Sequence, residues 1–303
     1  MRSHIRRFFV VAPLCVWFLA QPAAALDLNN LFNQLNNNPD LVNAIGSTVK
    51  NLSDANRTIG PKEEQEIGNG LASNMLGAAP LVADASLQRY VNDVGVWVAS
   101  QSEAVGVNWR FGVIDTNTIN SFAMPGGIVF ITRGLLAQMH SEAELACVLG
   151  HETTHVLRHH HVRAIQSGAG KDALGNALQG VVAYKGNQQA QQIGANLASG
   201  FSEVYVRGLD KDDEFAADIT GMVLCARAGY NPYALPAVLQ TLDALNPQDS
   251  NLQLMFSTHP SPRARLDKID QVVGDRLEPW ASGTENTSRF NAIAAKYGVK
   301  TAP

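Results

Sequence analysis

The chain has 303 residues, of which 46% are hydrophobic and only 17% are charged, with a formal net charge of −4. Three of its 23 Lys and Arg residues and none of its 27 Asp and Glu residues lie in residues 1–25, so the chain without them has a net charge of −7. An acidic chain with no basic cluster is not expected to bind nucleic acid, and its length fits one large domain or two small ones.

The first 25 residues have the pattern of a secretory signal peptide. Three arginines precede an apolar run, residues 8–20, and residues 23–25 supply an A-x-A cleavage site. The apolar run is too short to span a bilayer at about 1.5 Å per residue. Cys15 follows Leu14 and not the small residue that a lipoprotein signal needs. We therefore expect a protein exported to the periplasm that is not a lipoprotein.

The next segments predict packing elements. Residues 26–60 are rich in Asn and form a loosely packed N-terminal leader in our interpretation. Pro61 begins a predicted helix over residues 61–75, with acidic residues in its first turn where the helix dipole favours them. A second helix is predicted over about residues 85–100, because Leu87, Val91 and Val94 recur at helical spacing.

Two strands are predicted next, at residues 107–114 and 128–132, with the turn 124–127 before the second. We expect them to pair into a small antiparallel sheet. In zinc proteases an extended substrate commonly adds a strand to the edge of such a sheet. A purely structural hairpin is the alternative, and the sequence leaves both open.

The segment 141–161 carries the strongest signal, the H-E-x-x-H sequence from His151 to His155. Ser141 and Glu144 fit a capping box that begins a helix. Residues four apart share one helix face, so His151 and His155 can bind a single Zn²⁺, while Glu152 can border the metal as a general base. Chance occurrence and a pair of buried histidines are the alternatives that the surrounding sequence must exclude.

His161 competes as a third ligand, since its spacing from His151 matches a longer motif, H-E-x-x-H-x-x-G-x-x-H. That motif needs a helix break at Gly, yet Arg158 stands there, so we reject His161 as a ligand. His159 and His160 are interpreted as groups behind the ligands or on the surface.

The third ligand is expected on a second helix. Residues 163–213 are rich in Gly, Ala and Gln and are either a cover over the cleft or disordered. The second helix then runs from about Asp210 to Ala228 and places Glu214, Asp218, Gly221 and Cys225 on one stripe. Glu214 can complete a His₂Glu zinc site, and Asp218 can accept the other ring N–H of a ligand histidine.

The two cysteines of the mature chain, Cys147 and Cys225, fall on the metal-facing stripes of these two helices. Cys147 lies roughly 6 Å along its helix from His151, and Cys225 roughly 16 Å along its own from Glu214. This offset favours two buried thiols over a disulfide, which needs Cα atoms within about 7 Å.

The motifs together resemble the M48 zinc metallopeptidases. They are H-E-x-x-H, Glu214-x-x-Ala217-Asp218, the segments 226–232 and 257–260, Arg265-Leu266, and the stretch 120–127 that is similar to the strand and loop before that family's helix. The likeness covers roughly residues 61–271 and is closest to the secreted, periplasmic bacterial branch, here without tetratricopeptide repeats. It implies an α+β, mainly helical, gluzincin-type zincin with a small β-sheet beside the active-site helix. We divide the chain into the signal peptide (1–25), the leader (26–60), the peptidase domain (61–275) and a C-terminal tail (276–303).

The resemblance also implies the chemistry. One Zn²⁺ per chain would be held by His151, His155 and Glu214, with Glu152 moving the proton of the attacking water. His259, fixed in an extended approach by Pro260, is expected to enter the cleft opposite Glu152. It could then hydrogen-bond the oxyanion or occupy the open zinc position and block it. Arg265 could hold a nearby carboxylate or the substrate.

The expected function is zinc-dependent endopeptidase activity on exported polypeptides, misfolded or outer-membrane proteins in particular. Peripheral association with the outer membrane or its assembly machinery would fit this function. The alternative is a periplasmic chaperone or assembly factor that holds unfolded chains in the same cleft with little proteolysis.

Overall fold

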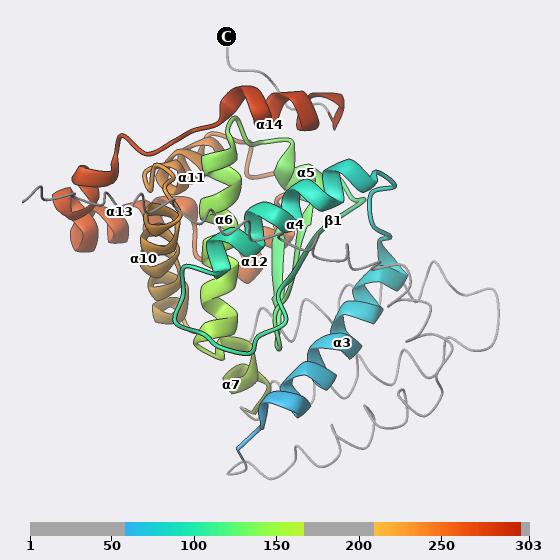
Figure 1. Ribbon diagram of the computed structural model, residues 1–303. Helices are drawn as coiled ribbons and strands as arrows, with labels where there is room; N and C mark the ends of the chain where they lie inside the picture. The colour runs from blue at the N-terminus through green and yellow to red at the C-terminus, as the bar shows by residue number, and fades with distance from the viewer. Residues whose placement is uncertain (1–57, 167–208, 298–303) are drawn as a thin grey trace, which may run out of the picture.

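The computed structural model describes residues 58–166 and 209–297, and these form an α+β fold in which helices predominate (Figure 1). The helices are α3 Pro61–Ala78, α4 Ala85–Ala99, α5 Arg133–Leu136, α6 Glu142–Leu157, α7 His160–Gln166, α10 Lys211–Arg227, α11 Ala234–Asp243, α12 Gln253–Thr258, α13 Pro262–Val273 and α14 Thr287–Ala294. The strands are β1 Arg110–Ile114, β2 Ser121–Met124 and β3 Ile128–Thr132, and two 3-10 helices, η1 Gly274–Trp280 and η2 Ala295–Tyr297, complete the described chain. The expected class, a mainly helical fold with a small sheet, is confirmed.

The small sheet lies between two layers of helix. Alternate residues of β3 point to opposite faces, so Val129 and Ile131 pack with α4 and α6, whereas Ile128 and Phe130 pack with α3. All five residues of β3 are buried, which a strand covered on both faces requires. The sheet thereby supports α6 from one side and leaves α3 on the other side of the sheet, at the lower right of Figure 1.

The predicted pairing of the sheet was wrong. β1 pairs with β3 in parallel, and β2, which lies in the stretch 120–127 but was not included in the predicted sheet, pairs with β3 antiparallel, giving the order β1-β3-β2. The chain reverses twice between β1 and β3, once over residues 115–120 and once at the turn containing Gly126 and Gly127. Both glycines have positive φ, 79° and 100°. Two reversals return the chain to its starting direction, so β1 and β3 run parallel.

The helix α6 forms as its cap predicts, and almost all of it is buried. The Ser141 hydroxyl accepts from the Glu144 N–H at 3.2 Å. The Glu144 carboxylate accepts from the His140 N–H at 2.7 Å and not from that of Ser141, so the capping box is formed one residue out of register. Every residue from Glu142 to Val156 is buried, which places both histidines of the motif in the interior.

The helices α6 and α10 cross in close contact and run antiparallel. A Cβ atom added at Gly221 would lie 2.7 Å from the backbone nitrogen of His151, so only glycine permits this approach. Contacts continue on both sides of the crossing, from Cys147 with Cys225 at one end to Arg158 with Thr220 toward the other.

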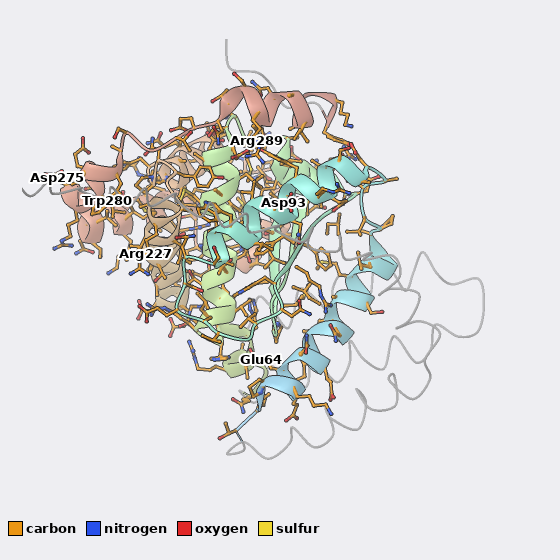
Figure 2. All side chains as sticks on the ribbon, viewed as in Figure 1. Glu64, Asp93, Arg227, Asp275, Trp280 and Arg289 are labelled. Carbon is orange, nitrogen blue, oxygen red and sulfur yellow. A yellow bond between two sulfur atoms is a disulfide. The ribbon has the colours of Figure 1, made fainter. Side chains whose placement is uncertain are left out.

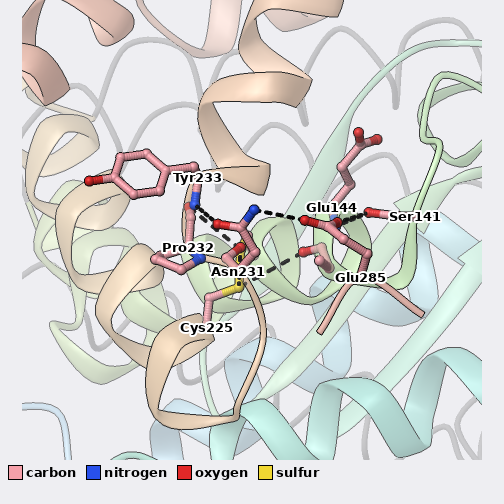
Figure 3. The surroundings of a disulfide bond; sticks show 9 residues. Ser141, Glu144, Cys225, Asn231, Pro232, Tyr233 and Glu285 are labelled. Atoms are coloured by element: carbon pink, nitrogen blue, oxygen red, sulfur yellow. Dashed lines mark hydrogen bonds between the residues drawn. A yellow bond between two sulfur atoms is a disulfide. The ribbon is translucent and has the colours of Figure 1, made fainter. Parts of the chain in front are cut away.

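The expectation of two free thiols was wrong, because Cys147 and Cys225 form a disulfide with their Cα atoms 5.0 Å apart (Figure 3). The prediction measured each cysteine from a metal ligand and assumed that His151 and Glu214 lie at the same level. The helices cross at Gly150 and Gly221, and the cysteines lie three and four residues from these glycines on the same side. The long Glu214 side chain bridges the difference in level.

The segment expected to be a C-terminal tail packs onto the same core as far as residue 297. Phe290 of α14 is fully buried in the main hydrophobic cluster. Arg289 of α14 lies over the start of α6 and pairs with the buried Glu142 at 3.3 Å (Figure 2). Glu285 accepts hydrogen bonds from Ser141 and Asn231 at 2.9 and 2.7 Å beside the disulfide (Figure 3).

Some sequence interpretations lie outside the described residues. They concern the signal peptide (1–25), nearly all of the N-terminal leader, and the Gly-rich segment over residues 167–208. Among the described residues, no helix combines the length and apolarity needed to cross a membrane.

Candidate metal centre

The two motif histidines meet as the helical spacing predicts. His151 and His155 lie one turn apart on α6, are 3% and 1% exposed, and bring their Nε2 atoms within 3.0 Å of each other. Their rings meet edge to face at 72°. Two ring nitrogens at this distance cannot both present lone pairs without a proton or a cation between them.

Glu214 approaches the same point from α10. Its Oε1 lies 3.4 Å from His155 Nε2, and its Oε2 lies 3.7 Å from His151 Nε2. The side chain is 1% exposed, and within the described chain Oε1 accepts no hydrogen bond. Two nitrogens and a carboxylate with an unsatisfied buried oxygen therefore converge on one point, and this donor set fits a zinc ion.

His151 is held from behind by a buried ion pair. Its Nδ1 lies 2.9 Å from Asp218 Oδ1, and Arg265 of α13 binds both Asp218 oxygens at 2.9 and 2.5 Å. Burial alone would raise the pKa of Asp218, but Arg265 outweighs it and holds this pKa well below its usual range. Asp218 is therefore a carboxylate that accepts the Nδ1 proton of His151, which leaves Nε2 with its lone pair.

His155 is held by a second arrangement, which the sequence reasoning missed. His155 Nδ1 lies 2.9 Å from Nδ1 of His160, a residue that is 1% exposed. His160 Nε2 in turn lies 3.5 Å from Asp213 Oδ1, and Asp213 pairs with Arg163 at 2.7 Å. Burial lowers the pKa of His160 to about 4, so the ring is neutral and its Nδ1 can accept the proton of His155 Nδ1.

A helix break creates this second arrangement. α6 ends at Leu157, His159 has a φ of 51°, and α7 begins at His160. The sequence argument that no break occurs without Gly at position 158 was therefore wrong. The His161 ring does lie inside, with its centroid 5.3 Å from that of His155. His159 has an exposed side chain that pairs with Glu64 at 3.0 Å.

Glu152 borders the centre and is fixed by a residue from the sheet. It is 2% exposed, and its Oε1 accepts a hydrogen bond of 2.7 Å from the Ser121 hydroxyl at the start of β2. The stretch 120–127 was recognised in the sequence as a whole, but Ser121 was not singled out. A serine at the first position of a strand carries no signal of its own, and only the packing of β2 against α6 reveals the contact.

His259 reaches the centre from the other side. It has extended backbone angles, φ −129° and ψ 153°, as expected before proline, and its Nδ1 lies 2.5 Å from Glu214 Oε2. His151, Glu214 and His259 thus form a second convergent set, with ligand atoms all within 4.8 Å of one another. Two sets share His151 and Glu214, and they differ in whether His155 or His259 is the third member.

The protonation of the two motif histidines follows from their neighbours. Burial and Arg265 act to lower the pKa of His151, but Asp218 and Glu214 outweigh them and raise it. Burial, together with the charge of His151, places the pKa of His155 well below its usual value. The neighbours of His151 therefore favour its protonated form, whereas burial and the charge of His151 favour the neutral form of His155.

The fold and this site define a class: helical proteins with a small sheet in which two antiparallel helices bring two histidines and a glutamate to one point beside a further buried carboxylate. The chain belongs to peptidase family M48, whose model matches residues 84–273. It is 28% identical to the beta-barrel assembly-enhancing protease of Escherichia coli (strain K12) over 295 residues, which cover 86% of this chain and 58% of that protein.

Two further relatives are similar to this chain. The beta-barrel assembly-enhancing protease of Yersinia pestis is also 28% identical, over 86% of this chain and 53% of its own length. The mitochondrial metalloendopeptidase OMA1 of Arabidopsis thaliana is 32% identical over 57% of this chain and 33% of its own. This chain therefore spans somewhat more than half the length of the bacterial relatives that it matches.

Proposed function

We propose that this chain is a zinc-dependent endopeptidase that holds one Zn²⁺ with His151, His155 and Glu214. One observation carries the proposal: the buried Nε2 atoms of His151 and His155 lie 3.0 Å apart, and each has an oxygen of the buried Glu214 carboxylate within 3.7 Å, beside the buried carboxylate of Glu152. When bound, the zinc ion acts as a Lewis acid that polarises the substrate carbonyl and makes water more acidic. Asp218 and His160 orient the two ligand histidines through their Nδ1 protons.

Glu152 moves the proton in this proposal. The Ser121 hydroxyl donates to Oε1 and holds the carboxylate in one orientation, so Oε2 takes the proton of the attacking water. The same carboxyl group then delivers that proton to the leaving amine. Because Glu152 is buried, the proton that it takes from the attacking water passes to the leaving amine and not to bulk solvent.

His259 has two roles that fit its position beside Glu214. In the first, its N–H hydrogen-bonds the oxyanion of the substrate, and losing such a donor costs about 10²–10³ in turnover. In the second, it approaches the open metal position and keeps the resting enzyme inactive. Slower cleavage by His259→Ala would support the first role, and faster cleavage the second. Arg265 does not act on the substrate in either of these roles, since it is bound to both oxygens of Asp218.

The substrates are polypeptides, and we propose that they are exported proteins that have misfolded or failed to assemble. The relatives named beta-barrel assembly-enhancing proteases support this choice, and the expected signal peptide supports a periplasmic location. The interpretation that the substrate adds a strand beside β2 stays a prediction.

The test uses the purified chain with unfolded outer-membrane proteins, with and without a chelator. Cleavage that is lost with chelator and restored by zinc is the expected result. Glu152→Gln should bind zinc as the wild type does and cleave nothing, because the ligands remain and the base does not. Undiminished proteolysis by this variant would show that Glu152 is not the general base. The alternative, a holding chaperone, would be supported if Glu152→Gln kept unfolded outer-membrane proteins soluble as well as the wild type while the wild type cleaved none.

A further inference from the structure

Two hollows flank Glu152 and His259, and their walls differ in chemistry. One is lined by β2 and by polar groups, among them Ser121, His155 and Thr258. The other is also lined by polar residues, among which His151, Glu152 and His259 belong to the candidate metal centre, while Asn120, Ser121 and Arg265 complete the polar lining. Most of its lining, however, is an apolar wall that is entirely aliphatic or thioether and comes from four helices.

The residues of that apolar wall are Leu135, Val148, Leu235, Val238, Leu239, Leu242 and Met255. Four of them lie on α11, whose apolar side faces α6, and all seven are at most 6% exposed. The hollow measures about 370 Å³ with its mouth, and its enclosed part has room for about two water molecules. Because most of the lining is apolar, a small apolar group that enters this part is removed from water together with the apolar surface that it covers.

We propose that this hollow is a specificity subsite that takes the side chain of one of the two residues flanking the scissile bond, and that it selects short aliphatic side chains such as those of Ala and Val. This inference rests on the proposed peptidase function and names its sequence preference. The occupant is a substrate side chain because the hollow shares His151 and Glu152 with the catalytic arrangement. A charged side chain would lose its hydration against the apolar wall, and an aromatic ring exceeds the enclosed space.

Val238 is the position at which to test the subsite, and Val94 provides a matched control. Both are valines in helices, both are 2% exposed in the same core cluster, and only Val238 lines the hollow. Truncation to Ala removes the same atoms from each, so the two variants lose comparable packing. A change in cleavage preference seen with Val238→Ala alone therefore comes from the subsite and not from a loosened core.

The experiment is the cleavage of a peptide mixture that presents every side chain at each position around the scissile bond. Mass spectrometry of the products identifies the bonds that are cut. Wild type should prefer Ala and Val at one position adjacent to the cleaved bond. Val238→Ala should shift that preference toward Leu and Met by about 10-fold or more in relative kcat/KM, since one methylene in an apolar pocket changes it by roughly 10–200-fold. Val238→Leu, which fills the hollow, should shift it toward Gly and Ala, and Val94→Ala should leave it unchanged.

The outcomes separate the subsite from the peptidase function. An unchanged preference in both Val238 variants, with cleavage intact, overturns the subsite and leaves the peptidase function standing. An equal shift in Val94→Ala also overturns it, because the effect would then come from general loosening. If the zinc-loaded wild type cleaves no peptide, the proposed function itself fails, and the subsite fails with it.

Discussion

The two ligand histidines are supported in different ways, and the difference separates stability from metal binding. We call the chain His151–Asp218–Arg265 the buried arm and the chain His155–His160–Asp213–Arg163 the relay arm. The buried arm ends in an ion pair whose side chains are 1% and 7% exposed. The relay arm inserts a neutral imidazole and ends in an ion pair whose side chains are 24% and 52% exposed.

The access of water to each ion pair determines how much stability is lost when one partner is removed. If the relay arm is cut at its outer end, water can replace the lost partner, as it does for most surface ion pairs. If the buried arm is cut, a charge remains in the interior with no partner, which is among the most destabilising changes a protein can suffer. Both arms orient a histidine that we propose as a zinc ligand, but only cutting the buried arm leaves an uncompensated charge in the interior.

The largest effect is expected from Asp218→Ala. This change leaves the Arg265 guanidinium buried and unpaired, so the free energy of unfolding should fall by about 3–5 kcal/mol. Denaturant unfolding of the metal-free protein measures it. The double variant Asp218→Leu/Arg265→Met removes both charges and should be more stable than the single variant. If it is less stable, the uncompensated charge is not the cause.

Removal of the disulfide should act on both arms together, since it joins the helices that carry them. The bridge closes a separation of 78 residues, and Cys147→Ala/Cys225→Ala should lower the free energy of unfolding by about 2–4 kcal/mol. A native mass two hydrogens below the reduced mass establishes the bridge in the purified protein. An identical mass before and after reduction would contradict it.

The relay arm should affect metal binding more than folding. His160→Ala removes the acceptor of the His155 Nδ1 proton, and zinc affinity should fall by about 10–100-fold, the usual effect of losing a group behind a ligand. A competition titration with a zinc-binding dye measures this. His140→Ala is the control, because this histidine precedes α6, pairs with Glu144 and is not part of either arm. Equal affinities in the two variants would show that His160 does not orient His155.

The smallest effect is expected from Asp213→Asn at the outer end of the relay arm. The partly exposed pair with Arg163 should contribute at most about 1 kcal/mol, and water or the amide can still face His160. Zinc affinity should change less than in His160→Ala. If the free energy of unfolding fell as much as in Asp218→Ala, both arms would depend on a paired charge, and the proposed difference between them would be wrong.

The local parts of this structure were predictable from the sequence because they depend on nearest neighbours. The spacing of His151 and His155, the cap at Ser141 and the stripe from Glu214 to Gly221 each use the geometry of one helix. The parallel pairing of β1 with β3 required the strand at 121–124 to be included in the sheet, and its four residues are all buried and show no alternation that would indicate its partner.

The errors share one physical origin, the relative placement of elements. The disulfide depends on the level at which α6 and α10 cross, which is fixed by Gly150 and Gly221 and not by the metal ligands. The relay arm depends on a helix break at His159, a residue in a backbone conformation that glycine adopts more readily. Asn, Asp and His enter this region more often than other side chains, so a His-rich turn after the motif was a usable signal.

Zinc affinity in His155→Ala and His259→Ala tests the metal assignment most directly. His151 and Glu214 belong to both convergent sets, so only these two variants separate a site completed by His155 from one completed by His259. We expect His155→Ala to lose far more zinc affinity than the roughly 100-fold lost with an orienting group, whereas His259→Ala should still bind one zinc per chain within about tenfold of the wild-type affinity. Retained affinity in His155→Ala together with a collapse in His259→Ala would contradict it.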